Sequence, residues 1–116
     1  IGYVEYTYAI KGGLKVVTLQ NRDGYYVKPS LEGFQAALKH VQWGEDFYAD
    51  LTYQPGPQTW PIVGATWALL PVERKERNKL VAGFFRWGFT KGDGIAKELY
   101  YAPLPQEVKE KIENLW

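Results

Sequence analysis

The 116-residue chain contains no cysteine and no methionine, one histidine and one serine. The lack of cysteine excludes disulfides, thiolate metal sites and cysteine nucleophiles. His40 and Ser30 form a catalytic triad only if distant residues converge on them, so we predict that the chain is not an enzyme. We expect no metal and no cofactor, because the sequence contains no ligand or cofactor motif of recognised spacing.

Neither charge sign predominates in the chain. Fourteen Lys and Arg residues oppose thirteen Asp and Glu residues, which gives a formal net charge of +1. The basic residues are dispersed apart from residues 74–77, where Glu76 interrupts the run and a solvated first helical turn is the simplest interpretation. We therefore expect no nucleic-acid partner.

Long hydrophobic runs are also missing. No uninterrupted apolar stretch of about 18 residues occurs, so no transmembrane segment is predicted. The hydrophobic fraction of 46% and the aromatic fraction of 16% nevertheless favour an ordered chain with one core.

The first third of the chain has the pattern of strands and a hairpin. Alternation over residues 1–9 predicts a buried strand, and the apolar run at residues 14–19 predicts a second. Residues 21–24, Asn-Arg-Asp-Gly, predict a turn, with residues 25–27 as the returning arm. Tyr25 and Tyr26 are expected to be exposed beside this turn.

Helical spacing marks residues 31–41, with Ser30 as the expected N-cap. Glu45, Asp46 and Asp50 form an acidic cluster that could bind a cation, but the N-terminus of an additional helical turn over residues 45–51 is the preferred interpretation. Two prolines make residues 53–59 a loop. The apolar run at residues 60–70 predicts a buried strand.

The last third of the chain reads as three helices. Residues 73–90 carry an apolar stripe with Phe84, Phe85 and Trp87, which predicts that these rings lie in the core. Asp93 is expected to cap a short helix, and Lys91-Gly92-Asp93-Gly94 lacks the spacing of a phosphate-binding loop. The final helix should expose two ion pairs, Glu107 with Lys111 and Lys109 with Glu113. The order of strands and helices predicts an α/β protein.

Three separated stretches share one further pattern. They are Ile1-Gly2-Tyr3-Val4-Glu5-Tyr6, then Trp60-Pro61-Ile62, and finally Phe84-Phe85-x-Trp87 with Leu99-x-Tyr101-x-x-Leu104-Pro105-x-x-Val108 and Trp116. In this order they resemble the C-terminal part of the periplasmic phosphate-binding proteins that feed ABC transporters. Because the chain starts on Ile1 inside a predicted strand and lacks methionine, we predict that it is a fragment.

The resemblance implies a two-lobed periplasmic-binding-protein fold of the class II type, with a mixed sheet flanked by helices. Residues 1–57 would belong to the second lobe, residues 58–70 would cross between lobes, and residues 71–116 would complete the first lobe. Trp60, Pro61 and Ile62 would act as the hinge. Thr66 is a candidate cleft-lining residue, although a β-branched residue in a strand is the simpler interpretation. The family's phosphate ligands lie upstream of Ile1, so none is assigned here.

The resemblance also implies a function and partners. The chain would be part of a receptor that captures inorganic phosphate and delivers it to ABC permease subunits, together with the missing N-terminal portion of the same receptor. It would be periplasmic or extracellular, and membrane-associated through the transporter or an upstream lipid anchor. The alternative is a self-contained protein-interaction or oligomerisation domain that binds no small ligand, because uncovered apolar faces drive association.

Overall fold

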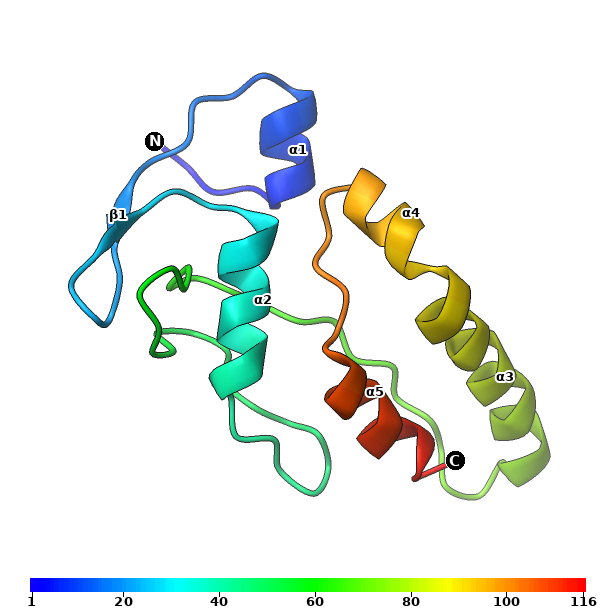
Figure 1. The fold of residues 1–116 in the computed structure, drawn as a ribbon. Coiled ribbons are helices and arrows are strands. Elements are labelled where there is room, and N and C mark those ends of the chain that lie inside the picture. The colour runs from blue at the N-terminus through cyan, green and yellow to red at the C-terminus, as the bar shows by residue number, and fades with distance from the viewer.

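A computed structural model describes residues 1–116 of the protein. Helices and one small sheet alternate with long irregular connections (Figure 1). In chain order the elements are α1 (Tyr6–Lys11), β1 (Leu19–Gln20), β2 (Tyr26–Val27), α2 (Leu31–His40), α3 (Lys75–Lys91), α4 (Asp93–Glu98) and α5 (Gln106–Glu113). The mixture of helix and strand agrees with the predicted α/β class, but the expected mixed sheet is reduced here to one two-stranded hairpin.

The predicted strand over residues 1–9 is wrong, because its second half forms α1. The ring of Tyr6 packs edge-on against Phe34 at 5.2 Å and against Tyr100 at 6.0 Å. Aromatic pairs prefer this geometry, and they hold α1 against α2 and the end of α4. The helix stops at Gly12, and Gly13 follows with a positive φ of 64°. Contacts distant in sequence therefore outweighed a local alternation that suggested a strand.

The predicted hairpin is confirmed, although it is short. β1 and β2 pair antiparallel with Leu19 opposite Val27, and Gly24 has the positive φ of 88° that the turn between them requires. Of the strand predicted over residues 14–19, only the end pairs, so that prediction is wrong for residues 14–18. Tyr25 and Tyr26 are exposed as expected.

α2 begins and ends where the sequence indicated. The Ser30 hydroxyl oxygen accepts a hydrogen bond from the Gly33 N–H at 3.0 Å, which confirms Ser30 as the N-cap. Gly33 is buried, and a Cβ there would lie 3.0 Å from the Gln58 carbonyl oxygen. His40 ends the helix on the surface. The glycine thus lets residues 58–60 approach the helix closely.

The helical turn predicted over residues 45–51 is wrong, because the carboxylates there close local turns instead. Asp46 accepts the Tyr48 N–H at 3.0 Å, and Asp50 accepts the Thr52 N–H at 2.9 Å. The backbone and then the hydroxyl of Thr52 lower the pKa of Asp50 below its ordinary value of 3.8. Each aspartate thus fixes the chain beside it.

α3 confirms the long helix but corrects its predicted buried face. Phe84 and Trp87 stack on each other at 6.2 Å, yet they are 63% and 54% exposed. Ala82 is the buried residue of this helix. The prediction that these two rings lie in the core is wrong, because more than half of each side chain remains exposed. α4 is confirmed, but Asp93 is its first residue and Gly92 is the N-cap.

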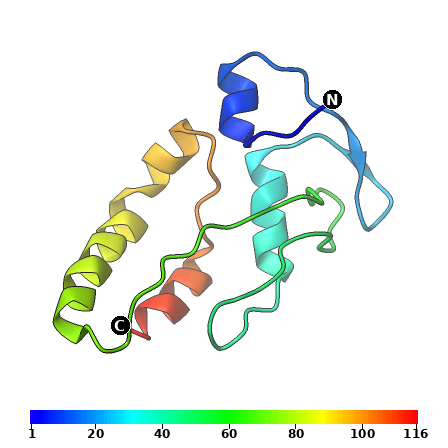
Figure 2. The ribbon, with the colours of Figure 1, turned by 180° about the vertical axis from the view of Figure 1, so that it is seen from behind.

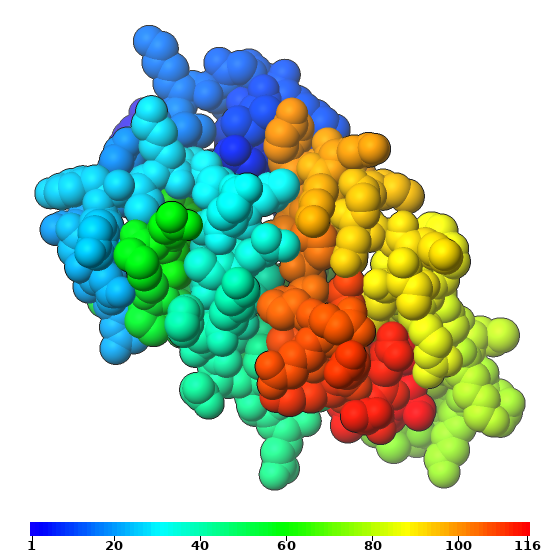
Figure 3. Space-filling model, in the orientation of Figure 1, coloured from blue at the N-terminus to red at the C-terminus, as the bar shows by residue number.

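α5 lies between α2 and α3, as the space-filling view shows (Figure 3). The predicted pair of Glu107 and Lys111 is confirmed at 2.9 Å. The predicted pair of Lys109 and Glu113 is wrong, because Lys109 turns inward and binds Asp93. The amphipathic pattern of α5 placed Lys109 in solvent, whereas a carboxylate on a neighbouring helix draws it into the interior.

The core is small and lies where α2 ends. Its buried members are Leu38, Val41, Ala49 and Leu51, and the partly buried Trp43, Val63, Ala65 and Leu104 pack around them. Only 16 of the 116 residues are buried, and the radius of gyration is 15.8 Å. A compact chain of this length has a radius of roughly 13.4 Å. The chain is therefore more extended than a compact domain of its size.

Candidate functional site: the crossing segment and its anchor

Residues 58–70, predicted to cross between lobes, join the α2 region to the start of α3. We call them the crossing segment. In the view from behind they run across the molecule, past the loop that leads into α5, toward the start of α3 (Figure 2). The segment forms no strand, so the buried strand predicted over residues 60–70 is wrong for this structure.

The predicted hinge residues lie at the fixed end of this segment. Trp60 and Pro61 are buried, while Ile62 is exposed. The Trp60 N–H donates to the Gly33 carbonyl at 3.2 Å, and the Pro61 carbonyl accepts the Tyr53 N–H at 2.8 Å. The start of the segment is thus held to α2 and to the preceding loop. After Pro61 no backbone hydrogen bond holds the segment.

A buried polar network fixes the loop before Trp60. The amide nitrogen of Asn21 donates to the carbonyls of Gly56 at 3.1 Å and Pro57 at 3.0 Å, and its oxygen accepts the Tyr25 N–H at 2.9 Å. Thr59 is fully buried, and its hydroxyl donates to the Pro55 carbonyl at 2.8 Å. We call Asn21, Gly56, Thr59 and Trp60 the anchor. The anchor joins the hairpin turn to the crossing segment.

Beyond the anchor the burial pattern has a period of two. Val63 and Ala65 pack against the core, whereas Ile62, Gly64 and Thr66 are exposed. Alternation of this kind is the mark of extended backbone with one face inward. Thr66 therefore lies on the outward face, where the structure places it in solvent.

The middle of the crossing segment is held by a side chain. The indole N–H of Trp67 donates to the Phe47 carbonyl at 3.0 Å, and its ring stacks with Tyr48 at 6.2 Å. A Cβ added at Gly64 would meet no atom within 4 Å. The stretch between the anchor and Trp67 is thus held at its start by the anchor and at its end by the Trp67 side chain, with open space around Gly64. This arrangement is suited to a change of backbone angles.

A second polar centre lies in a hollow of about 330 Å³ between α3, α4 and α5. The ammonium group of Lys109 donates to both carboxylate oxygens of Asp93 at 2.6 Å and to the Phe89 carbonyl at 3.0 Å. An ammonium group has three donors. All three are used within the chain, so this centre joins helices and leaves no donor for an incoming anion.

The single serine and the single histidine lie apart. Ser30 and His40 stand at opposite ends of α2, which spans roughly 15 Å for ten residues. No group of three or more His, Asp or Glu side chains is placed to hold a metal ion. Measured against the length and apolarity that a membrane crossing requires, every helix of the structure falls short.

Comparison with known proteins supports the resemblance seen in the sequence. No family model matches the chain. It is 41% identical over 120 aligned residues to the phosphate-binding protein PstS of Haemophilus influenzae, covering all of this chain and 36% of that protein. It is 42% identical to PstS of Pasteurella multocida, covering 35% of it, and 38% identical to PstS of Xylella fastidiosa strain Temecula1, covering 33%. The chain is PstS-like.

The PstS-like chain corresponds to a C-terminal portion of these relatives and spans about a third of their length. The predicted resemblance is therefore confirmed. Sequence reasoning missed the anchor partners Asn21 and Thr59 and the inward turn of Lys109. Asn21 had been recognised only as a turn residue, since nothing local indicates a bond to Gly56, 35 residues away.

Proposed function

We propose that the chain is part of a substrate-binding protein that captures inorganic phosphate and delivers it to an ABC importer, by binding and release without catalysis. The observation that carries this proposal is the similarity of 41–42% over the whole chain to proteins named phosphate-binding protein PstS. The phosphate ligands would lie in the part of the protein outside this chain. Partners would be the permease subunits and the N-terminal portion of the same receptor.

In this proposal the whole protein has two lobes that close on the ion. Residues 1–57 would belong to one lobe and residues 71–116 to the other, with residues 58–70 crossing between them. One observation supports a hinge at Trp60, Pro61 and Ile62: hydrogen bonds hold the backbone of Trp60 and Pro61, so Ile62 is the first residue beyond a rigid support. A hinge needs a few residues at the end of a rigid element that absorb the change in φ and ψ.

Thr66 is proposed as a cleft-lining residue on the strength of its outward-facing position in the crossing segment. The whole protein would act outside the cytoplasmic membrane, in the periplasm or at the cell surface, and would be held near the membrane by the transporter or by an upstream lipid anchor.

Calorimetric titration of phosphate tests the function. The chain would be measured alone and in complex with the part of Haemophilus influenzae PstS that lies outside the match, with sodium chloride of equal ionic strength as the control titrant. We expect heat only in the complex. No heat from a folded complex would contradict phosphate binding, and heat from the chain alone would contradict our placement of the ligands.

A second candidate function is an interaction or oligomerisation domain that binds no small ligand. The observation that favours it is the exposed apolar surface, in which Leu69 and Leu80 are 91% and 78% exposed. Light scattering distinguishes the two: this alternative requires a stable homo-oligomer of the chain alone, and a monodisperse monomer would contradict it.

A further inference from the structure

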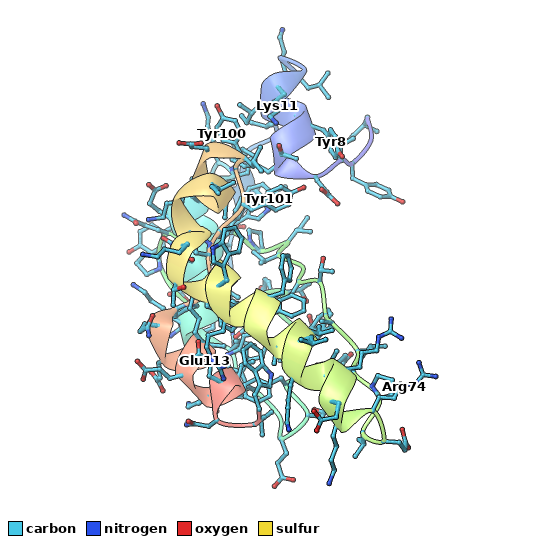
Figure 4. All side chains as sticks on the ribbon, turned by 90° about the vertical axis from the view of Figure 1, so that its right-hand side faces the viewer. Tyr8, Lys11, Arg74, Tyr100, Tyr101 and Glu113 are labelled. Carbon is cyan, nitrogen blue, oxygen red and sulfur yellow. The ribbon has the colours of Figure 1, made fainter.

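Two neighbouring residues at the start of α1 contact two neighbouring residues just after α4. The hydroxyl of Tyr101 donates to a carboxylate oxygen of Glu5 at 2.7 Å, and the ring of Tyr100 packs edge-on against that of Tyr6 at 6.0 Å. Tyr100 and Tyr101 lie together beside α1 in the side-chain view (Figure 4). We call Glu5, Tyr6, Tyr100 and Tyr101 the clasp. Its hydrogen bond joins positions 96 residues apart in the sequence.

The clasp crosses the proposed boundary between the lobes. Glu5 and Tyr6 belong to residues 1–57, and the two later tyrosines belong to residues 71–116. No other hydrogen bond or ion pair joins these two parts of the chain. Leu104 also packs against the core, but an apolar contact has no preferred direction. Apart from the crossing segment, the clasp is therefore the directional link between the two parts.

The clasp lies next to the proposed hinge. The ring of Tyr6 also packs edge-on against Phe34, at 5.2 Å. The residue before it, Gly33, accepts the N–H of Trp60 at its carbonyl, at 3.2 Å. The first turn of α2 thus supports both the clasp and the anchor. A second support beside a hinge restricts twisting and sideways motion, which one flexible connection would allow.

The backbone of Tyr100 is strained. Its φ of 63° lies in the left-handed region, which is rare for a bulky side chain. The N–H of Tyr100 donates to the carbonyl of Lys97 at 3.0 Å, and that of Tyr101 to the carbonyl of Ala96 at 2.8 Å, so the end of α4 is a Schellman motif. Glycine is the usual residue at this position and would be free of strain. Such strain persists where other contacts hold it, and the contact here is the ring of Tyr6.

We propose that the clasp is a positioning contact that restricts the lobes of the PstS-like receptor to the closing motion and so presents phosphate with a preorganised cleft. This rests on the proposed function, which supplies the assignment of the lobes. A receptor with one flexible connection populates many arrangements of its lobes, and its apparent affinity falls with the fraction that is competent to bind. The clasp keeps this fraction high, because its contacts are present in both the free and the phosphate-bound receptor.

Phosphate titration of a chimera, in which the chain replaces the matched third of Haemophilus influenzae PstS, tests the proposal. Tyr101→Phe removes only a hydroxyl, and we expect the calorimetric Kd for phosphate to rise about threefold to tenfold. Glu5→Ala should match it, and Glu5→Gln, which keeps an acceptor oxygen, should restore part of the affinity. Tyr8→Phe makes the same change at an exposed tyrosine of α1 and is the control. A Kd for Tyr101→Phe equal to that of the control would overturn the proposal.

The spread of distances between the lobes gives a readout that does not depend on phosphate. The chain has no cysteine, so spin labels on Lys28→Cys and Lys75→Cys, both at exposed positions, report one lobe each once any cysteine of the Haemophilus part is replaced by serine. Tyr100→Gly relieves the strain and removes the ring. We expect it to broaden the distance distribution about twofold in the free chimera and to leave the phosphate-saturated distribution unchanged.

Equal widths in the free wild type and the free Tyr100→Gly chimera would overturn the proposal. A wild-type chimera that gives no heat with phosphate would refute the proposed function, whereas the widths in the free proteins would still test the clasp.

Discussion

The ammonium nitrogen of Lys109 lies 2.6 Å from each carboxylate oxygen of Asp93, which joins α5 to α4 across sixteen residues of sequence. The Lys109 side chain is only 4% exposed, whereas that of Asp93 is 47% exposed. The same nitrogen also donates to the Phe89 carbonyl of α3. One buried cation therefore holds three helices together.

Removal of the carboxylate should cost more than removal of the cation. Asp93→Ala leaves a buried ammonium without its counter-ion, and we expect the free energy of unfolding to fall by about 2–4 kcal/mol. Lys109→Met leaves a carboxylate that water reaches, and we expect a loss of about 1–2 kcal/mol. Urea unfolding followed by circular dichroism measures both. Lys111→Met, which breaks an exposed pair, is the control and should change stability by less than about 0.5 kcal/mol. A cost for Asp93→Ala no larger than that of the control would contradict this account.

Asn21→Asp should destabilise the anchor, although the asparagine and aspartate side chains have almost the same size and shape. The replaced amide nitrogen faces the carbonyls of Gly56 and Pro57 at 3.1 and 3.0 Å, so a carboxylate oxygen there would meet two acceptors. We expect a loss of about 2–4 kcal/mol in the free energy of unfolding, measured in urea. Gln42→Glu makes the same chemical change in an exposed loop and should be close to neutral. Equal effects of the two substitutions would show that the buried network contributes little.

Gly56→Ala tests the backbone of the same loop. Gly56 has a φ of 125°, and a Cβ there would collide with the hydroxyl of the buried Thr59. We expect a loss of at least about 1–3 kcal/mol, read from thermal or urea unfolding. Gly64→Ala, where the added Cβ meets no atom within 4 Å, is the control and should change stability by less than about 0.5 kcal/mol. A neutral Gly56→Ala would mean that this loop relaxes readily.

The hydroxyl of Tyr101 donates to a carboxylate oxygen of Glu5 at 2.7 Å and so ties the C-terminal third to the start of α1. Tyr101 lies beside α1 in the side-chain view (Figure 4). This hydrogen bond, with smaller contributions from desolvation and from the charge of Glu5, raises the pKa of Tyr101 above its ordinary value of 10.0. Because the folded pKa is raised, the stabilisation is complete below pH 10 and is lost as the pH rises through the folded value.

Glu5→Gln should therefore lower the pKa of Tyr101 toward 10.0 and remove the alkaline loss of stability associated with this pair. An NMR titration of the Tyr101 ring carbon bound to oxygen measures the pKa directly, and Tyr101→Phe assigns the signal. Glu32→Gln, on the exposed side of α2, is the control and should leave the titration unchanged. An identical Tyr101 titration in the wild type and Glu5→Gln would refute the contact.

Local chemistry alone determined several parts of this protein. Ser30 caps α2 because its hydroxyl reaches an N–H three residues away, and the turn between β1 and β2 follows from an Asp-Gly step. The periodicity of α3 and the prolines of the loop at residues 53–59 were equally sufficient. The PstS resemblance also came from sequence, since it depends on the order of short motifs rather than on contacts.

Tertiary structure decided the conformation of residues 1–9, the burial of Lys109 and the pairing of residues 60–70, because each depends on contacts with residues that are distant in sequence. Residues 1–9 alternate like a strand, but Tyr6 packs against Phe34 and Tyr100, and α1 forms. Lys109 has the spacing of a surface residue, yet Asp93 draws it inward. The sequence indicated a strand over residues 60–70, and a strand requires hydrogen-bond partners that residues 1–116 do not supply. Propensity selects a backbone conformation, whereas burial and pairing depend on what the rest of the fold places beside it.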